Sequence, residues 1–415
     1  MFNLLTNRWL GPDRLAVVLL PVAGLAAAAA LLPLGVMRYD MAKHYIPWME
    51  AVRAGGLASM SSEFADYSPP YIYLMYLASW LVPLVGEATA IKLINVPFIA
   101  TLSVAIYQIV LHSSGSRRSA AIAAAIMCVA PTPLVNAFAW GQTDAIYTSF
   151  LALFVLFAIR RSPVAAAWMF GVALAFKLQA IFLLPVLVYL VLAKRMRVAH
   201  LLFVPFAYLL MMVPAAIAGR PWLELITIYL GQLQTSSHLA IDAPNPWKIV
   251  GALALVNYET GLFIGVAAAG LAGLAIAVGS VRLEPNSRTI VLVAALSAAF
   301  MPYLLPTMHE RYFFVADVMT LTLAWVIPCL WVTAPLFQIG SLLSYMGYFQ
   351  LSVHGPAYGL LPVTLGVGML ALEYVRAQIR SSVSIRAVFP LRRWANDHVN
   401  LRYRPEHGPV RNVAR

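Results

Sequence analysis

Long apolar runs separated by short polar segments fill most of the chain, and their lengths predict membrane-spanning helices. A helix needs about 20 predominantly apolar residues to cross a bilayer. We therefore predict an all-α polytopic membrane protein with a bundle of about twelve transmembrane helices and amphipathic helices in the first loop between spans. The predicted spans are residues 15–36, 91–112, 119–136, 143–159, 163–177, 178–193, 198–218, 259–281, 289–306, 311–333, 335–353 and 357–375.

Two stretches of this pattern allow more than one interpretation. Residues 71–85 are apolar but short, and a span there would move the basic pair at 117–118 to the other side of the membrane. We predict a re-entrant or interfacial helix for them. The apolar run 165–192 also allows one long tilted helix. We divide it at Lys177, because a charge in mid-bilayer is costly and a charge at the apex of a helix hairpin is not.

Composition excludes the soluble, disordered and fibrous classes. Hydrophobic residues make up 62% of the chain, charged residues only 11%, and the mean hydropathy is +0.81. Soluble domains are about 45–50% apolar and about 25% charged. The two cysteines, Cys128 and Cys329, lie in apolar runs, so we expect no disulfide framework. No cleavable signal peptide is visible, and the first apolar run reads as a retained helix.

Basic clusters predict the orientation, because cytoplasmic loops of membrane proteins collect Lys and Arg. Twenty of the 28 basic residues fall in clusters that an even number of spans separates. We therefore expect a transmembrane domain over 1–375 with both termini cytoplasmic, and a basic cytoplasmic tail over 376–415 that contacts anionic headgroups. Two long loops, 37–90 and 219–258, then face outward. These cytoplasmic basic clusters account for the net charge of +12, so the charge does not indicate nucleic-acid binding.

The first outer loop carries two candidate acids. Asp40 directly follows the first predicted span, where a partly desolvated carboxylate can act as a base. Capping of a helix start is the alternative for Asp40. Asp66 and Tyr67 precede two prolines, and a turn-forming Asp66 is as plausible there as a sugar-binding one.

Three further polar side chains gather where the chain passes from 119–136 into 143–159. Trp140, Gln142 and Asp144 combine an aromatic face, an amide and a carboxylate, which together resemble a sugar-binding platform. The simpler alternatives are that Gln142 caps the next helix and that the helix dipole stabilises Asp144.

Cations suited to phosphate occur at two places predicted to lie at the outer rim. Lys177 interrupts a long apolar run, and its charge suits a lipid phosphate unless the side chain snorkels to the interface. His309, Glu310 and Arg311 share a tight turn between two predicted spans. His309 and Arg311 are competent phosphate donors. The turn lacks HExxH spacing, so no zinc site is expected, and no other metal or cofactor is implied. The sequence also lacks a Walker A motif and a strand-linked GxGxxG motif, so nucleotide binding is not expected.

Five motifs in this order resemble the GT-C-fold glycosyltransferases that use polyprenyl-phosphate sugars, chiefly the bacterial members and more distantly the dolichyl-phosphate-glucose glucosyltransferases. The resemblance covers about residues 14–330. It rests on an acid after the first span (Asp40), DYSPPY (66–71), WGQTD (140–144), FKLQAIFLLP (176–185) and MHERYFF (308–314). It implies that Asp40 is the catalytic base and that His309 and Lys177 contact the donor. The role of Arg311 rests on its chemistry alone.

These observations favour an integral glycosyltransferase of a bacterial inner membrane, with its site facing the periplasm. We expect inverting transfer of a hexose or pentose from a polyprenyl-phosphate sugar to a glycan or lipid-linked acceptor, with Asp40 as base. Lys177, His309 and Arg311 would bind the donor phosphate, and Asp66, Tyr67, Trp140, Gln142, Asp144 and Glu310 would bind the sugar or the acceptor. The alternatives are a transporter or flippase, for which no internal repeat is evident, and a scaffolding subunit of a polysaccharide-assembly complex.

Overall fold

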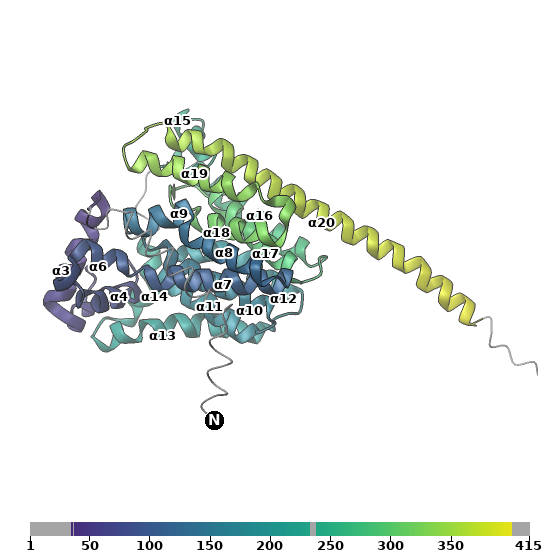
Figure 1. Cartoon of the computed structure of the whole chain (residues 1–415), viewed down its shortest axis with the longest axis horizontal. Helices are drawn as coiled ribbons and strands as arrows, with labels where there is room; N and C mark the ends of the chain where they lie inside the picture. Colours follow the sequence, from purple (N-terminus) through teal and green to yellow (C-terminus); the bar gives the residue numbers. More distant parts are fainter. Residues whose placement is uncertain (1–34, 36, 233–237, 401–415) are drawn as a thin grey trace, which may run out of the picture.

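The computed structural model describes residue 35 and residues 37–232 and 238–400, with side chains to residue 382. The predicted first span, 15–36, lies outside the described residues except for Gly35, as does the end of the basic tail. Apart from one pair of two-residue strands, the regular secondary structure of the described residues is helical. Figure 1 shows the helices as one bundle, from which α20 (Gly355–Asn400) extends far beyond the others.

Six helices of the described part of the chain are long and apolar enough to cross a membrane. A seventh candidate is the bent pair Arg117–Val129 and Pro131–Trp140, whose halves meet at 42°. The structure is thus that of an all-α polytopic membrane protein, but the predicted count of twelve spans is not confirmed. The six are Glu87–Ser114 (α6 and α7), Val198–Ile217 (η5 and α13), Tyr258–Ser280 (α16), Ser287–Leu304 (α17), Pro328–Tyr348 (η6 and α19) and Gly355–Ser382 (within α20).

Several predicted spans are shorter helices in the structure. Residues 311–333 were expected to form one span, but α18 (Phe314–Val326) ends just before Pro328. Proline lacks the N–H of a helix interior and disfavours the helical conformation at the residue before it, here Ile327 at φ −130°. The chain then continues as the short 3₁₀ helix η6 (Pro328–Leu330) and α19 (Thr333–Tyr348).

The break at Lys177 is confirmed. α11 (Pro163–Phe176) ends there, and Lys177 itself is extended at φ −157° and ψ 134°. The 3₁₀ helix η4 (Leu178–Leu183) and α12 (Leu184–Leu192) follow. α11 packs against α10 (Asp144–Ile159) and α13 (Phe203–Ile217), whereas α12 packs against α16 and α17.

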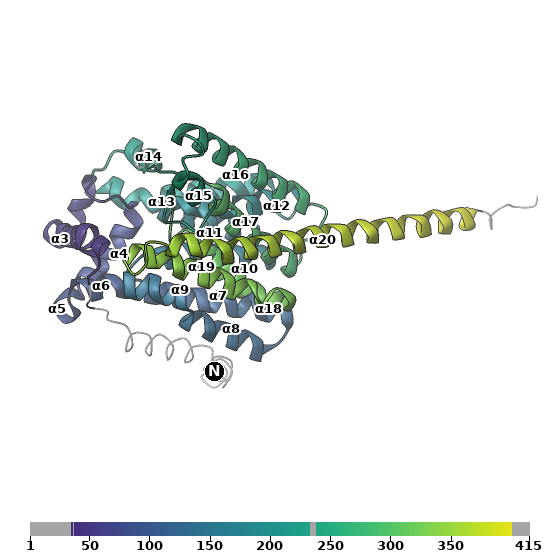
Figure 2. The same ribbon diagram turned by 90° about the horizontal axis from the view of Figure 1, so that it is seen from above.

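The segment 37–90 forms short helices at one end of the molecule, as Figures 1 and 2 show. α3 is amphipathic as predicted, because it buries Trp48, Met49 and Val52 and exposes Glu50 and Arg53. Helix α4 has 11 residues and α5 has four, too short to span a bilayer. The helices of the segment are the π-helix η1 (Met41–Tyr45), α3 (Ile46–Gly55), the 3₁₀ helix η2 (Gly56–Ser61), α4 (Pro69–Ser79), α5 (Val82–Val85) and α6 (Glu87–Leu93).

The buried centre of the bundle lies on α7 (Val96–Ser114), α8 (Arg117–Val129), α10, α17 and α18. Helix α8 leads through α9 (Pro131–Leu134) to a second π-helix, η3 (Val135–Trp140). π-Helical turns occur frequently at functional sites. Here the two π-helices adjoin Asp40 and Gln142, which lie together in the structure.

The segment 219–258 supplies the only strand pairing in the described chain. It consists of α14 (Trp222–Gln232), β1 (Ala240–Ile241) and α15 (Trp247–Ala252). β1 runs parallel to β2 (Met308–His309), in the turn between α17 and α18. Sequence analysis predicted helices alone, so this pairing, which fixes the backbone at His309, is an addition.

Candidate functional site

A cavity of about 910 Å³ lies where the segments 37–90 and 219–258 meet the bundle. Its wall combines residues of η1, α3 and the stretch 63–68 with the end of α11, α14, the turn 309–312 and the end of α19. Seven of the ten predicted site residues line it: Asp40, Asp66, Tyr67, Lys177, His309, Glu310 and Arg311.

Asp40 is held by hydrogen bonds from three sides. Its Oδ2 accepts from Gln142 Nε2 at 2.8 Å and from Trp140 Nε1 at 3.2 Å, and its backbone N–H donates to the Tyr348 hydroxyl at 3.0 Å. Trp140 stacks on Tyr348 with ring centroids 4.0 Å apart. The Asp40 side chain caps no helix. The carboxylate is therefore oriented by side chains distant in sequence, and the capping alternative is not supported.

Gln142 connects Asp40 to two tyrosines. Its Oε1 accepts from Tyr45 at 3.0 Å and from Tyr67 at 3.4 Å, and the two hydroxyls lie 3.0 Å apart. Burial raises the pKa of Tyr45 well above its usual value, so its hydroxyl keeps its proton. Because the Tyr45 hydroxyl donates to Oε1 of Gln142, the amide is oriented with its NH₂ group toward Asp40. Gln142 is fully buried and does not cap α10.

Lys177 and Asp144 form a buried ion pair. Lys177 Nζ lies 2.5 Å from Asp144 Oδ1, and Asn136 Nδ2 donates to Asp144 Oδ2 at 2.9 Å. The Lys177 side chain is only 11% exposed, which does not support snorkelling into water. Asp144 is fully buried in the first turn of α10.

Two carbonyl groups at the end of α11, just before Lys177, accept hydrogen bonds from other segments. The last carbonyls of a helix lack partners within it. Here Ser68 Oγ donates to the carbonyl of Ala175 at 2.6 Å, and Tyr229 Oη donates to that of Leu174 at 2.6 Å. The segments 37–90 and 219–258 are thereby both bound to the end of α11, next to Lys177.

The turn after α17 carries an internally paired charge cluster. Arg311 Nη1 donates to Glu310 Oε1 at 2.9 Å, and His309 Nδ1 lies 3.7 Å from Glu310 Oε2. Burial alone would raise the pKa of Glu310, but the interaction with His309 and the charge of Arg311 outweigh it and lower the pKa. Glu310 is therefore ionised at neutral pH.

Arg311 keeps hydrogen-bonding capacity beyond its pair with Glu310. Its Nε is buried and has no hydrogen-bond partner. The guanidinium carbon lies 5.6 Å from the Trp140 ring, whose N–H donates to Asp40, and 5.8 Å from Tyr312. Lys177 Nζ lies 6.0 Å from the same Tyr312 ring. The two cations therefore flank one ring on the wall of the cavity.

Trp140, Gln142 and Asp144 do not form the predicted sugar-binding platform. All three are fully buried and stand behind the cavity wall. Their polar groups are already engaged, those of Trp140 and Gln142 by Asp40 and that of Asp144 by Lys177. They orient residues that line the cavity.

Three contributors to the site escaped sequence analysis. Tyr45 and Tyr348 resemble many other aromatic residues of this apolar chain. Asn136 was detectable in principle, since it is a lone amide in a predicted span, but it lies outside the quoted motifs. Only the fold brings these residues to Asp40 and Asp144.

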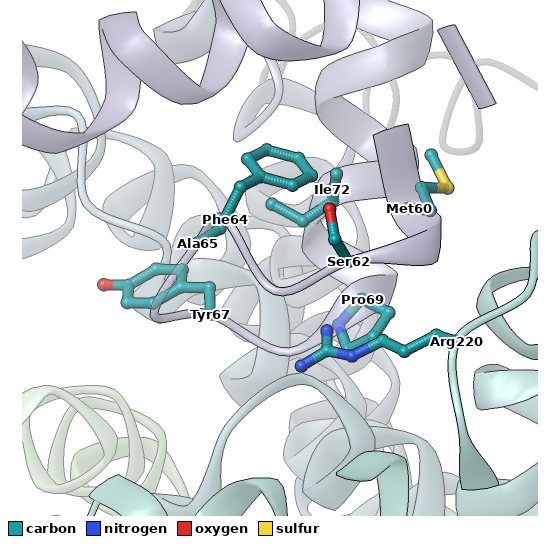
Figure 3. A pocket seen from close by; sticks show the side chains of 8 residues that line it. All are labelled: Met60, Ser62, Phe64, Ala65, Tyr67, Pro69, Ile72 and Arg220. Atoms are coloured by element: carbon teal, nitrogen blue, oxygen red, sulfur yellow. The ribbon is translucent and has the colours of Figure 1, made fainter. Parts of the chain in front are cut away.

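Arg220 fastens the stretch 62–69 from behind. It is 6% exposed and lies 3.5 Å from Glu63 and 3.4 Å from Glu224. Figure 3 shows its guanidinium beside Pro69, in a small pocket that Tyr67 also lines. The pocket holds about 10 Å³, close to the room one water needs.

In the described residues, no three His, Cys, Asp or Glu side chains are grouped so that they could hold a metal ion. A reaction without a bound metal stays a prediction.

Comparison with protein families decides the class of activity. The family model of Glycosyltransferase family 87 matches residues 64–306, more than half of the chain. The chain belongs to glycosyltransferase family 87. This family is among the GT-C-like polyprenyl-phosphate-sugar glycosyltransferases, so the resemblance seen in the motifs is confirmed. A search of the curated proteins finds no match.

Family membership makes the chain a membrane glycosyltransferase and does not support the transporter and scaffold alternatives. The match includes Asp66, Trp140 and Lys177, whereas Asp40 and the turn at 309–311 lie outside it. For those residues the argument rests on the geometry of the cavity.

Proposed function

We propose that this family 87 enzyme transfers a hexose or pentose from a polyprenyl-phosphate sugar to a glycan or lipid-linked acceptor, with inversion, at the periplasmic face of a bacterial inner membrane. The observation that carries the proposal is one cavity lined both by Asp40 and by three side chains competent to bind phosphate, Lys177, His309 and Arg311.

Donor binding is assigned to the cations. A polyprenyl phosphate is a competent leaving group, and its oxygens gain charge as the bond to the sugar breaks. Donors placed in advance around such a developing charge are usually the largest contribution to catalysis. The unpartnered Nε–H of Arg311 supports a role in donating a hydrogen bond to a phosphate oxygen. Lys177 stays paired with Asp144 and adds its charge at the same wall.

Asp40 is assigned as the base of a single displacement. The acceptor hydroxyl oxygen attacks the anomeric carbon, the bond from that carbon to the phosphate oxygen breaks, and polyprenyl phosphate leaves. The hydroxyl proton passes to Asp40. One carboxylate suffices for inversion, by analogy with inverting glycosidases. The hydrogen bonds from Trp140 and Gln142 to Oδ2 orient the group for this transfer.

Asp40→Asn tests the assignment. The amide keeps the size of the side chain but cannot accept the proton. General-base removal costs roughly 10²–10⁴ in rate, so we expect sugar transfer at least about a hundredfold slower, with normal insertion and donor binding. The assay uses the full chain in lipid nanodiscs with radiolabelled polyprenyl-phosphate sugars. Near-normal transfer would reject Asp40 as the base.

The periplasmic orientation has a separate test. Single cysteines at positions 66 and 242, placed in a background without Cys128 and Cys329, should react with an impermeant thiol reagent in intact cells. A cysteine at position 117 should be protected. Labelling at 117 with protection at 66 and 242 would invert the proposed topology.

A further inference from the structure

Asp242 lines the cavity but has no part in the transfer reaction described so far. It directly follows β1 and forms a backbone bridge with His309. Ser344 Oγ donates a hydrogen bond to its backbone carbonyl. The segment 219–258 therefore places a carboxylate at a fixed position beside the turn that carries His309 and Arg311.

The backbone at this edge of the cavity adopts an uncommon conformation. Six non-glycine residues of the described chain have a positive φ, and two of them, Asp242 at +60° and Gln350 at +57°, line the cavity. Non-glycine residues in this region of φ are infrequent, and they cluster at active sites and ligand-binding sites. The conformation thus singles out these two side chains among those that line the cavity.

One oxygen of the Asp242 carboxylate is paired and the other is open. Oδ1 lies 2.6 Å from Lys248 Nζ. Oδ2 accepts no hydrogen bond from any residue that the structure describes. A Cβ at Gly347 would lie only 3.5 Å from Oδ2, and Gly347 also lines the cavity, so no side chain covers this oxygen there. A carboxylate oxygen accepts hydrogen bonds, which suits it to a hydroxyl group.

Gln350 supplies a donor and a further acceptor nearby. Its backbone N–H donates to the carbonyl of Gly347 at 3.1 Å, which ties it to the glycine beside Asp242 Oδ2. The residue is exposed, and its side-chain amide forms no hydrogen bond within the described part of the chain. Since hydroxyl groups both donate and accept, a carboxylate and an amide together can bind the hydroxyls of one sugar ring.

These groups lie between the proposed base and the proposed phosphate site. Asp242 adjoins Gly347, and the next residue, Tyr348, accepts a hydrogen bond from the Asp40 backbone at 3.0 Å. On its other side, Asp242 is bridged to His309. In a single displacement, the sugar that is transferred must lie between the attacking hydroxyl and the leaving phosphate. Asp242 therefore borders the place that this sugar has to occupy.

We propose that Asp242 and Gln350 form the subsite for the transferred sugar, whose ring hydroxyls donate to Asp242 Oδ2 and exchange hydrogen bonds with the Gln350 amide. The inference rests on the proposed function and deepens it, because it assigns recognition of the sugar to residues other than those that bind the phosphate. Lys248 orients the carboxylate and does not belong to the described cavity lining.

The test compares donors with a lipid of equal charge that has no sugar. The probes are a panel of polyprenyl-phosphate hexoses and pentoses, and polyprenyl methyl phosphate. Their affinities are measured for the full chain in nanodiscs without an acceptor. The unmodified protein should bind at least one sugar-bearing lipid more tightly than the methyl ester. Asp242→Asn should weaken that lipid roughly tenfold to a hundredfold, through loss of a charged acceptor, while the affinity for the methyl ester does not fall.

Two further variants separate sugar binding from a structural effect. Lys248→Met is the matched control, because it breaks the same ion pair and keeps the carboxylate, so it should retain the preference for the sugar-bearing lipid. Gln350→Gly should reduce the preference, and glycine readily adopts the φ of +57° at this position.

Arg311→Ala distinguishes the two proposals, because it should weaken the sugar-bearing lipid and the methyl ester alike. If the unmodified protein binds neither lipid, the proposed donor class is wrong and the subsite falls with it. If the protein binds both lipids equally well, only the sugar subsite is overturned. The same holds if Asp242→Asn keeps the preference for the sugar, if it weakens both lipids to the same extent, or if Lys248→Met loses as much as Asp242→Asn.

Discussion

The two sides of the cavity are built in opposite ways. Around Lys177 and Arg311, each cation has its own buried carboxylate, and the turn 309–312 is pinned between two helices and a strand. The side formed by residues 39–68, called here the first-segment wall, consists of short helices and loops whose acids Asp66 and Glu63 are more than half exposed. The comparison indicates that the side with Lys177 and Arg311 is preorganised by paired charges, whereas the first-segment wall carries exposed acids.

Asp40 stands between these regions. Its backbone belongs to the first-segment wall, yet its carboxylate is oriented by Trp140 and Gln142 from the bundle. The base is therefore held by the rigid part of the molecule while its neighbours in sequence remain accessible. Four predictions test the contrast, and the largest expected effect comes first.

Removing one member of the buried pair should damage the rigid side most. Asp144→Ala leaves Lys177 charged and unpaired within the protein. Breaking a buried ion pair by removing one partner costs about 3–5 kcal/mol. We expect a comparable loss of stability in denaturation of the purified protein, with Lys177→Met/Asp144→Ala recovering part of it. Equal stability of the single and double variants would refute a coupled pair.

Arg311→Ala should weaken donor binding, which is measured on the folded fraction because the substitution also leaves the buried Glu310 without its cation. Hydrogen bonds to charged groups contribute about 1.5–3 kcal/mol, so donor affinity should fall roughly tenfold to a hundredfold. Titration with polyprenyl phosphate measures it, and Arg53→Ala, which removes an exposed arginine outside the cavity lining, is the control. Unchanged affinity in the Arg311, His309 and Lys177 alanine variants would remove the phosphate site.

Gly141→Ala should disturb the link between the two regions. Gly141 has φ +90°, and a Cβ there would meet Met41 Cε and, at 3.3 Å, Lys92 Cγ. The left-handed conformation costs about 1–2 kcal/mol for a residue with a Cβ. We expect that loss of stability and a lower turnover number, because Gln142 would shift from Asp40. Gly86→Ala is the matched control, because Gly86 also has a positive φ but an added Cβ there would meet no other atom. An equal fall in the turnover number of Gly86→Ala would contradict an effect specific to Gln142 and Asp40.

Arg220→Gln should have the smallest effect. Its ion pairs to Glu63 and Glu224 are partly exposed, and such pairs contribute about 0.2–1 kcal/mol. We expect the free energy of unfolding to fall by at most about 1 kcal/mol and donor affinity to be unchanged, since Arg220 contacts Glu63 and Glu224 and does not line the main cavity. A fall in donor affinity as large as that of Arg311→Ala would show that the two sides are not independent.

Sequence reasoning succeeded where a polar residue interrupted an apolar pattern. The break at Lys177 followed from the cost of a charge in a bilayer, and the same reasoning marked the turn at 309–311. Both line one cavity with Asp40. It failed where the answer depended on packing between distant elements. Nothing in the spacing of Trp140, Gln142 and Asp144 shows that their polar groups are taken up by Asp40 and Lys177.

The predicted count of twelve spans is not confirmed, for a related reason. Hydropathy measures how apolar a run is and not what surrounds it, and the apolar helices α10 and α18 have only 16 and 13 residues and are almost wholly buried by protein. Apolar helices of 13 to 16 residues inside a bundle therefore look like spans in the sequence.

Mass spectrometry of lipids bound to the Asp40→Asn variant tests the central claim most directly. If cations on one wall hold the donor and Asp40 only removes the acceptor proton, this variant should copurify with an intact polyprenyl-phosphate sugar. The same lipid should be absent from the Asp40→Asn/Arg311→Ala double variant. An Asp40→Asn protein that carries no isoprenoid phosphate, or a double variant that retains it equally, would contradict the account.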